Sequence, residues 1–89
     1  MTRVVNINKE RCDVYVGRPS PFGNPYVIGK DGTREEVIAA YSVYFHKRLD
    51  FDPEWKAKVG ALKGRVLGCH CKPSACHGDV IAEWVDQES

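Results

Sequence analysis

A cluster of cysteine and histidine residues near the end of the chain limits the folds open to this sequence more than any other feature. Three of the four cysteines and two of the three histidines fall within nine positions: Cys69, His70, Cys71, Cys76 and His77. An apolar run with the character of a buried strand precedes the cluster, and the residues after it have the apolar spacing of an amphipathic helix. The segment 65–83 therefore predicts a strand, a turn and a helix, with thiol and imidazole groups gathered at the turn.

Composition bounds the rest of the chain. Its 89 residues predict a single domain, 1–89, and the 43% hydrophobic and 28% charged residues are ordinary for a globular protein. A net charge of +1 argues against bulk attraction to nucleic acid or to an acidic membrane. The sequence contains no apolar run of about 18 residues and no signal-peptide segment at its start, so we expect a cytoplasmic protein. Cytoplasmic thiols stay reduced, which favours a metal-binding or catalytic cluster over a disulfide framework.

Local patterns predict an α/β fold with a small sheet of three to four strands and about three helices, in a Rossmann-like three-layer or a two-layer arrangement. Thr33 and Glu36 form a capping box that begins a helix, and Asp52 followed by proline begins another. The expected strands are 3–7, 13–18 and 65–71, with a short edge strand at 26–28, and the expected helices are 33–49, 53–63 and 76–86. The first two strands, about six residues apart, suggest a hairpin, with a looser connection as the alternative.

A proline-rich loop, GRPSPFGNPY (17–26), follows the second strand. It is too rich in proline for a helix, yet it carries large specific side chains, which favours a binding loop. One reading has Phe22 filling the core and the loop merely covering the sheet edge. The other assigns ligand binding to Arg18, Ser20, Gly23 and Asn24. If the second and third strands are parallel, this loop and the cysteine turn meet at one edge of the sheet, where ligands bind in open α/β folds.

Three interpretations of the cysteine turn stay open. In the first, Cys69, Cys71, Cys76 and His77 hold a structural zinc ion, although the spacing C-x-C-x4-C-H is unusual for such sites. In the second, Cys71 or Cys76 is an activated nucleophile with His77 as its base or electrostatic partner, and Lys72 and Asp79 join the ligand-binding set. In the third, the cysteines are inert core residues and Asp79 only contributes a favourable charge to the first helical turn.

A group of basic residues precedes the third strand. Lys56, Lys58, Lys63 and Arg65 occur near a single acidic residue, Glu54. Such a run is usually a solvated face, and contact with nucleic acid phosphates is the alternative.

Two segments of the chain, VYVGRPSPFGNPYVIG and LKGRVLGCHCKPSACHGDVIAEW, resemble a family of small bacterial and phage proteins known as domain of unknown function 4326. Its members typically carry a GRPS-x-x-GNP loop and a closing CH-G/A-D-V motif. The matching positions are Gly17, Arg18, Gly23, Asn24, Pro25, Cys69, Cys71, Pro73, Cys76, His77 and Asp79. His70 departs from the pattern, where tryptophan is more usual. The resemblance implies a two-loop site and no particular activity.

The sequence thus predicts a crevice that binds a small anionic or nucleotide-like ligand, with a reactive cysteine as a candidate for enzymatic chemistry. The alternative is a zinc-stabilised module that engages nucleic acid or a protein partner.

Overall fold

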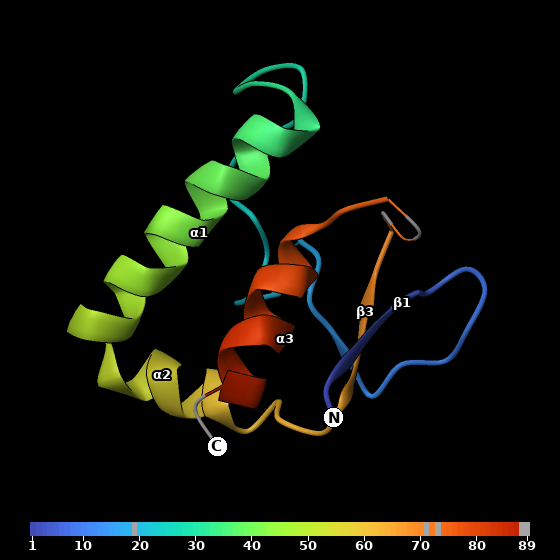
Figure 1. Ribbon diagram of the computed structural model, residues 1–89, viewed down its shortest axis with the longest axis vertical. Helices are drawn as coiled ribbons and strands as arrows, with labels where there is room; N and C mark the ends of the chain where they lie inside the picture. Colours follow the sequence, from blue (N-terminus) through green and yellow to red (C-terminus); the bar gives the residue numbers. More distant parts are fainter. Residues whose placement is uncertain (19, 71, 73, 88–89) are drawn as a thin grey trace.

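The computed structural model describes residues 1–18, 20–70, 72 and 74–87, and it has an α/β fold (Figure 1). In chain order the elements are β1 (Arg3–Asn6), β2 (Val14–Tyr15), α1 (Arg34–Phe51), α2 (Pro53–Gly60), β3 (Val66–Cys69) and α3 (His77–Gln87). Three strands and three helices confirm the fold class predicted from the sequence.

The sheet is parallel throughout, with strand order β1-β3-β2. The predicted hairpin between the first two strands is therefore wrong: both pair with β3, which lies between them. Their connection instead crosses one face of the sheet, over Gly68. A Cβ atom at that position would lie 2.5 Å from Cys12 Sγ and from Ile7 Cγ2, so only glycine lets the connection pack this closely. The predicted edge strand at 26–28 is also absent from the described residues, which show only an isolated bridge between Ile28 and Gly32.

The helices lie together on the other face of the sheet (Figure 1). Helix α3 packs on β1 and β3, and α1 and α2 pack on α3. Since Val4 and Val14 are both paired with Leu67 in the register, all three side chains point to this helical face. Helices thus cover one face and the β1–β2 connection covers the other. The Rossmann-like three-layer arrangement, which needs helices on both faces, is not confirmed.

Local sequence signals begin the first two helices where they were predicted. Thr33 accepts a hydrogen bond from the Glu36 amide, and the Glu36 carboxylate accepts one from the Thr33 amide, which completes the capping box of α1. The Asp52 carboxylate accepts a hydrogen bond from the Trp55 amide at the start of α2, and Pro53 occupies the first helical position. These bonds satisfy amides that have no partner inside a helix.

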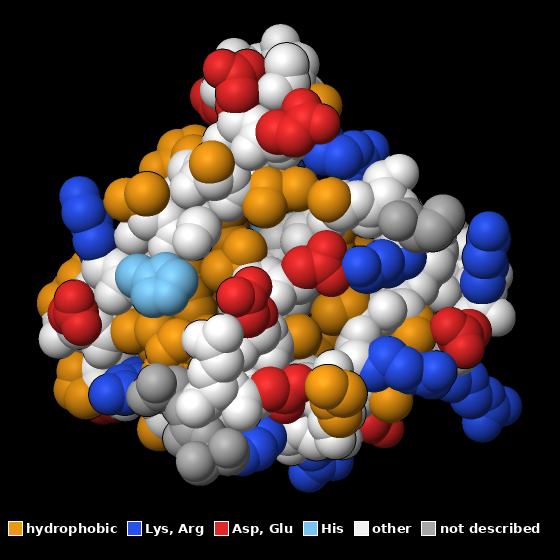
Figure 2. Space-filling model, in the orientation of Figure 1, with side chains coloured by type: hydrophobic (Ala, Val, Ile, Leu, Met, Phe, Trp, Pro, Cys, Tyr) orange, Lys and Arg blue, Asp and Glu red, His pale blue; other side chains and the backbone are white. Residues whose placement is uncertain are grey.

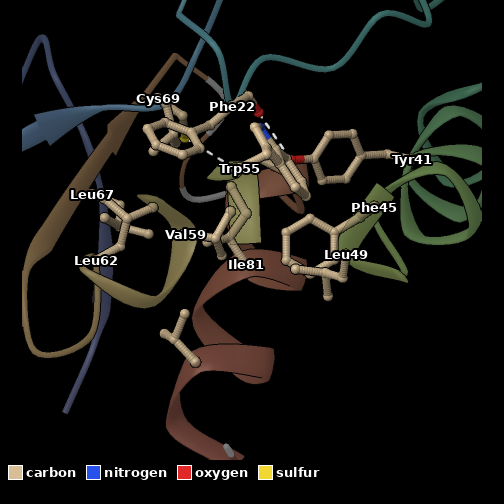
Figure 3. Packing of buried hydrophobic residues seen from close by; sticks show 13 residues of the cluster. Phe22, Tyr41, Phe45, Leu49, Trp55, Val59, Leu62, Leu67, Cys69 and Ile81 are labelled. Carbon is tan, nitrogen blue, oxygen red and sulfur yellow. Dashed lines mark hydrogen bonds between the residues drawn. The ribbon is translucent and has the colours of Figure 1, made fainter. Parts of the chain in front are cut away.

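The core lies between the three helices and the sheet (Figure 3). Its largest buried side chains are aromatic and come from α1 and α2, which explains the aromatic spacing of α1 as a packing pattern. They are Tyr41, Phe45 and Trp55. Phe45 contacts Trp55 edge to face with ring centroids 5.3 Å apart. Ile81 and Val85 of α3 complete the cluster from the sheet side.

No helix within the described residues is long and apolar enough to cross a membrane.

Candidate functional site

A pocket of about 690 Å³ lies at the edge of the sheet where β2 and β3 end. The loop after β2 contributes Gly17, Arg18 and Asn24, and the turn after β3 contributes His70, Cys76 and His77. Because the two strands are parallel, both segments leave the sheet at the same edge. The predicted meeting of the two loops in one crevice is thus confirmed for the described residues. Cys71, which was predicted to be part of this crevice, lies outside them.

The loop after β2 combines a core segment with a pocket segment. Phe22 is buried in the core, and its carbonyl accepts a 2.9 Å hydrogen bond from the buried Tyr41 hydroxyl. The indole N–H of Trp55 donates to the Pro21 carbonyl at 3.0 Å. These contacts hold the loop on the helices, while Arg18 remains exposed and lines the pocket. The interpretation of Phe22 as a core residue is therefore confirmed, and ligand binding by the loop stays a prediction.

Asn24 stabilises this loop through two side-chain hydrogen bonds. Its side chain is 9% exposed, donates to the Val37 carbonyl of α1 at 3.2 Å and accepts from the Tyr26 amide at 2.9 Å. Asn24 also lines the pocket, so it shapes the crevice wall by joining the loop to α1.

Gly23 and Ser20, the other two predicted binding residues of the loop, are not among the residues that line the pocket. A Cβ atom at Gly23 would lie 2.9 Å from Arg18 Cγ and 3.1 Å from its backbone nitrogen, so glycine permits the loop to close on Arg18. The Ser20 hydroxyl accepts a hydrogen bond from the Phe22 amide at 3.3 Å. Both residues shape the loop that presents Arg18.

Cys76 caps helix α3. Its Sγ accepts a hydrogen bond from the Gly78 amide at 3.2 Å, and the Asp79 carboxylate accepts one from the Cys76 amide at 3.1 Å. The Asp79 bond is the N3-to-cap half of a capping box, while the cysteine sulfur accepts from the second helical amide, in the place usually taken by a serine or threonine oxygen. The local sequence Cys-His-Gly-Asp thereby forms the start of α3.

The Cys76 thiol is 2% exposed and donates to Cys69 Sγ, with the two sulfur atoms 3.0 Å apart. Burial raises the pKa of Cys76 well above the usual thiol range, and the hydrogen bond with Cys69 raises it further. The thiol is therefore protonated at neutral pH. The helix start does not lower its pKa as the nucleophile interpretation requires.

His77 is held by the end of β2. Its Nε2 lies 2.6 Å from the Val16 carbonyl oxygen, and because a carbonyl can only accept, Nε2 carries the proton. Burial lowers the pKa of His77, and the nearby charge of Arg18 lowers it as well. The hydrogen bond to Val16 and the charge of Asp79 act in the opposite direction without reversing the shift. His77 is thus neutral at pH 7 and lines the pocket.

Lys72 and Asp79 pair with each other. Lys72 Nζ lies 2.6 Å from Asp79 Oδ1, and neither residue is among those lining the pocket. Burial lowers the pKa of Lys72, but the hydrogen bond and charge of Asp79 outweigh it, so the net shift is upward. Asn6 at the end of β1 donates to the Lys72 carbonyl at 2.7 Å. The pair and this bond fix the turn to the sheet and to α3.

Sequence reasoning did not identify several pocket residues. Arg34, in the first turn of α1, lines the pocket and donates from Nη1 to the Ala75 carbonyl at 3.2 Å. The capping box marks where this helix begins, but the contact that joins its start to the proline-rich loop, from Asn24 to the Val37 carbonyl, is not visible in the sequence. The remaining unpredicted lining residues are Tyr15, Tyr26, Val27, Ile28, Val37, Ile38 and Ala75.

A metal ion would need ligands beyond those that the structure brings together. Among the described residues, no group of three or more histidine, cysteine or acidic side chains is arranged to hold one. Cys69 and Cys76 meet, but the Nε2 of His77 is engaged with the Val16 carbonyl. The zinc interpretation also requires Cys71, which lies outside the described residues.

Comparison with known proteins places the chain in context. The family model described as domain of unknown function (DUF4326) matches residues 2–87. The "Uncharacterized 12.4 kDa protein in nrdA-td intergenic region" of Enterobacteria phage T4 is 41% identical over 88 residues, which cover 98% of this chain and 80% of the phage protein. No solved structure matches the chain.

Proposed function

This chain belongs to the DUF4326 family, and we propose that its crevice binds a small anionic, nucleotide-like ligand. The observation that carries the proposal is the charge of the pocket lining. Arg18 and Arg34 line it, and no aspartate or glutamate does so among the described residues. Arginine presents up to five N–H donors in a planar fork that suits carboxylate and phosphate groups.

The two guanidinium groups are available to a ligand to different degrees. Arg18 is exposed and forms no ion pair within the described part of the chain. Arg34 uses Nη1 for the Ala75 carbonyl, which orients its side chain between α1 and the cysteine turn. A phosphate or carboxylate bound by Arg18 would gain charge-assisted hydrogen bonds, the stronger kind in proteins.

The remaining walls suit an aromatic or apolar group. Tyr15 and His70 contact each other edge to face with centroids 5.6 Å apart, and both line the pocket. Tyr26 and Ile28 are 36% and 48% exposed at the same pocket, although both are large and hydrophobic. A pocket of about 690 Å³ is in the usual range for small-molecule sites. An anion joined to a flat heterocycle, as in a nucleotide, would contact both kinds of wall.

Covalent chemistry in the crevice has less support than binding. The Cys76 thiol is buried and protonated, and it caps α3. The neutral His77 ring offers a general base, because Nε2 is protonated and Nδ1 is the nitrogen left to accept a proton. An enzymatic role through Cys71 remains part of the sequence-based prediction.

Nuclear magnetic resonance titration of the ¹⁵N-labelled protein tests the binding proposal, with 5′-AMP and inorganic phosphate as probes. We expect 5′-AMP to shift the amides of pocket residues such as Gly17, Ala75 and His77. R18Q and R34Q should each weaken 5′-AMP binding about tenfold, since a hydrogen bond to a charged group contributes about 1.5–3 kcal/mol.

R65Q is the matched control, because Arg65 is exposed and precedes β3 at the opposite end of the strand from the pocket. Its affinity for 5′-AMP should equal that of the wild type. Absence of any shift at 10 mM of either probe, or binding that R18Q and R34Q leave unchanged, contradicts the proposal.

A second surface, between α2 and α3, supports nucleic acid binding as an alternative function. A hollow of about 410 Å³ between α2 and α3 is lined by Lys56, Lys63 and Trp84, among other residues. Trp84 is only partly buried, and lysine beside an accessible aromatic side chain is a pattern found in single-strand binding. Figure 2 shows acidic and basic side chains interspersed over the face that carries α1 and α3, which argues against a broad cationic surface there.

A mobility shift with single-stranded DNA tests this second candidate. If it holds, replacing Lys56, Lys58 and Lys63 by glutamine reduces the salt dependence of binding by about one unit of log–log slope per lost phosphate contact. The second candidate also includes a structural zinc ion, and metal analysis of protein purified without chelator tests for it. Stoichiometric zinc whose removal unfolds the protein would support the zinc-stabilised module.

A further inference from the structure

Cys69 and Cys76 bring two free thiols into direct contact within the crevice. Cys69 is the last residue of β3 and Cys76 caps α3, and the turn of the chain between them places their Sγ atoms 3.0 Å apart. The side chains are 1% and 2% exposed, and both line the pocket.

We propose that Cys69 and Cys76 are a redox-active dithiol that closes reversibly to a disulfide and thereby changes ligand binding in the crevice. The formation of the disulfide is independent of the proposed function. The effect on ligand binding rests on it.

The geometry favours closure of this pair. A disulfide bond is about 2.05 Å long, so the two sulfur atoms need to approach by only about 1 Å. The two residues are seven positions apart in the chain, so the bond closes a short loop. The pocket is the route by which a small oxidant reaches both atoms.

Cys12 provides an internal contrast. It is partly exposed, and its Sγ packs over Gly68 on the face of the sheet that the β1–β2 connection covers. The sheet therefore separates Cys12 from Cys69 and Cys76, which face α3. An oxidation that depends on proximity and on the pocket should leave Cys12 a free thiol.

The oxidation is balanced with hydrogen peroxide as the oxidant. One of the two thiols first loses its proton to a base in solution, a step that the raised pKa of Cys76 slows for that residue. The resulting thiolate attacks a peroxide oxygen, the O–O bond breaks, and a sulfenic acid and, after the hydroxide takes up a proton, one water form. The sulfur of the second cysteine then attacks the sulfenic sulfur, the S–O bond breaks and a second water leaves. Two thiols have lost two electrons and two protons, and one peroxide has become two waters. A dithiol reductant reverses the reaction by thiol–disulfide exchange.

Formation of the disulfide would alter the wall of the crevice around Cys76. The Cys76 sulfur now accepts from the Gly78 amide and donates to Cys69. In the disulfide the S–H donor is gone and Cys76 Sγ has moved towards β3, away from the cap of α3. The adjacent His77 lines the pocket and is held to Val16, so a shift of the cap also moves the imidazole. The affinity for a ligand in contact with His77 changes as a result.

Mass spectrometry of the whole chain tests the disulfide. The protein is treated with hydrogen peroxide, remaining thiols are alkylated, and the tryptic peptide 66–89 is fragmented to identify which of Cys69, Cys71 and Cys76 are linked. We expect a loss of 2 Da, a Cys69–Cys76 link, alkylated Cys12, and reversal by dithiothreitol. C12S should behave as the wild type, and C69S and C76S should each lose the 2 Da change.

The wild-type assignment stands even if C69S or C76S fails to fold. A link that includes Cys71, oxidation only to sulfinic acid, or no reaction at peroxide concentrations that oxidise Cys12 would overturn the proposal.

A titration of the reduced and the oxidised protein with 5′-AMP tests the effect on binding, and we expect the dissociation constants to differ at least threefold. Equal affinities would overturn the proposed effect of the disulfide on ligand binding, but not the formation of the disulfide itself. Absence of 5′-AMP binding in both states would overturn the proposed function and, with it, the proposed effect of the disulfide on binding. The mass spectrometry would still decide whether the disulfide forms.

Discussion

Asn24 gives the sharpest test of how the loop after β2 is built. Its amide donates to the Val37 carbonyl and its oxygen accepts from the Tyr26 amide, in a site that is 9% exposed. The substitution N24D keeps the size and the accepting oxygen. It replaces the donor by a carboxylate oxygen that faces the Val37 carbonyl, so that two acceptors meet with no proton between them.

The expected magnitudes follow from these contacts. N24A removes two hydrogen bonds, each contributing about 0.5–1.5 kcal/mol, and should lower the free energy of unfolding by about 1–3 kcal/mol. N24D at pH 7 buries an unpaired charge and should cost about 3–5 kcal/mol. Burial and the Val37 carbonyl raise the pKa of the introduced carboxyl in the folded state above its unfolded value of about 3.9.

The sign of the pH dependence follows from that shift. A carboxyl group whose pKa is raised on folding binds its proton more tightly in the folded state. The loss in the free energy of unfolding that N24D causes is therefore smallest below the unfolded pKa. It grows by up to about 1.4 kcal/mol per pH unit as pH rises towards the folded pKa. Protonated, the group can donate to Val37 as the amide does.

Urea unfolding at pH 4 and pH 7, followed by tryptophan fluorescence in a W84F background so that Trp55 alone emits, measures both effects. Trp55 is a suitable reporter, because its indole is buried and donates to the Pro21 carbonyl of the same loop. N8D is the matched control, since Asn8 is exposed in the β1–β2 connection. N24D as stable as the wild type at pH 7, or a deficit equal at the two pH values, would refute the reasoning.

Three further predictions concern the framework of the site. G68A should lower the free energy of unfolding by about 1–3 kcal/mol, because its methyl group meets Cys12, and adding C12A should restore part of the loss in urea titrations. Y41F should cost about 1–3 kcal/mol, because the loop carbonyl that accepts from the buried Tyr41 hydroxyl loses its partner, and an unchanged urea midpoint would contradict this. Hydrogen bonds from Thr2 lower the pKa of Asp86, so its stabilising effect is present above about pH 4 and lost as pH falls; D86N should flatten the stability profile between pH 3 and 7.

Local sequence patterns predicted the elements whose causes are local. The Thr33–Glu36 capping box and the Asp52–Pro53 pair each act within one helical turn, and both helices begin there. Local patterns do not predict strand pairing, because it joins residues that lie about 60 positions apart in the chain. The hairpin prediction failed for this reason: proximity in sequence favoured pairing β1 with β2, whereas both strands gain more by pairing with the buried β3.

The site divides in the same way. The sequence alone determined that a proline-stiffened loop and a thiol–imidazole turn both follow strands, and parallel pairing then required them to share an edge. Only the tertiary structure decided what each side chain does there. Arg34 enters the pocket from α1, Lys72 is neutralised by Asp79, and Cys76 caps a helix while its thiol meets Cys69. These roles depend on distances between groups that are separate in the chain, and on burial, which sets whether a thiol or an imidazole is charged.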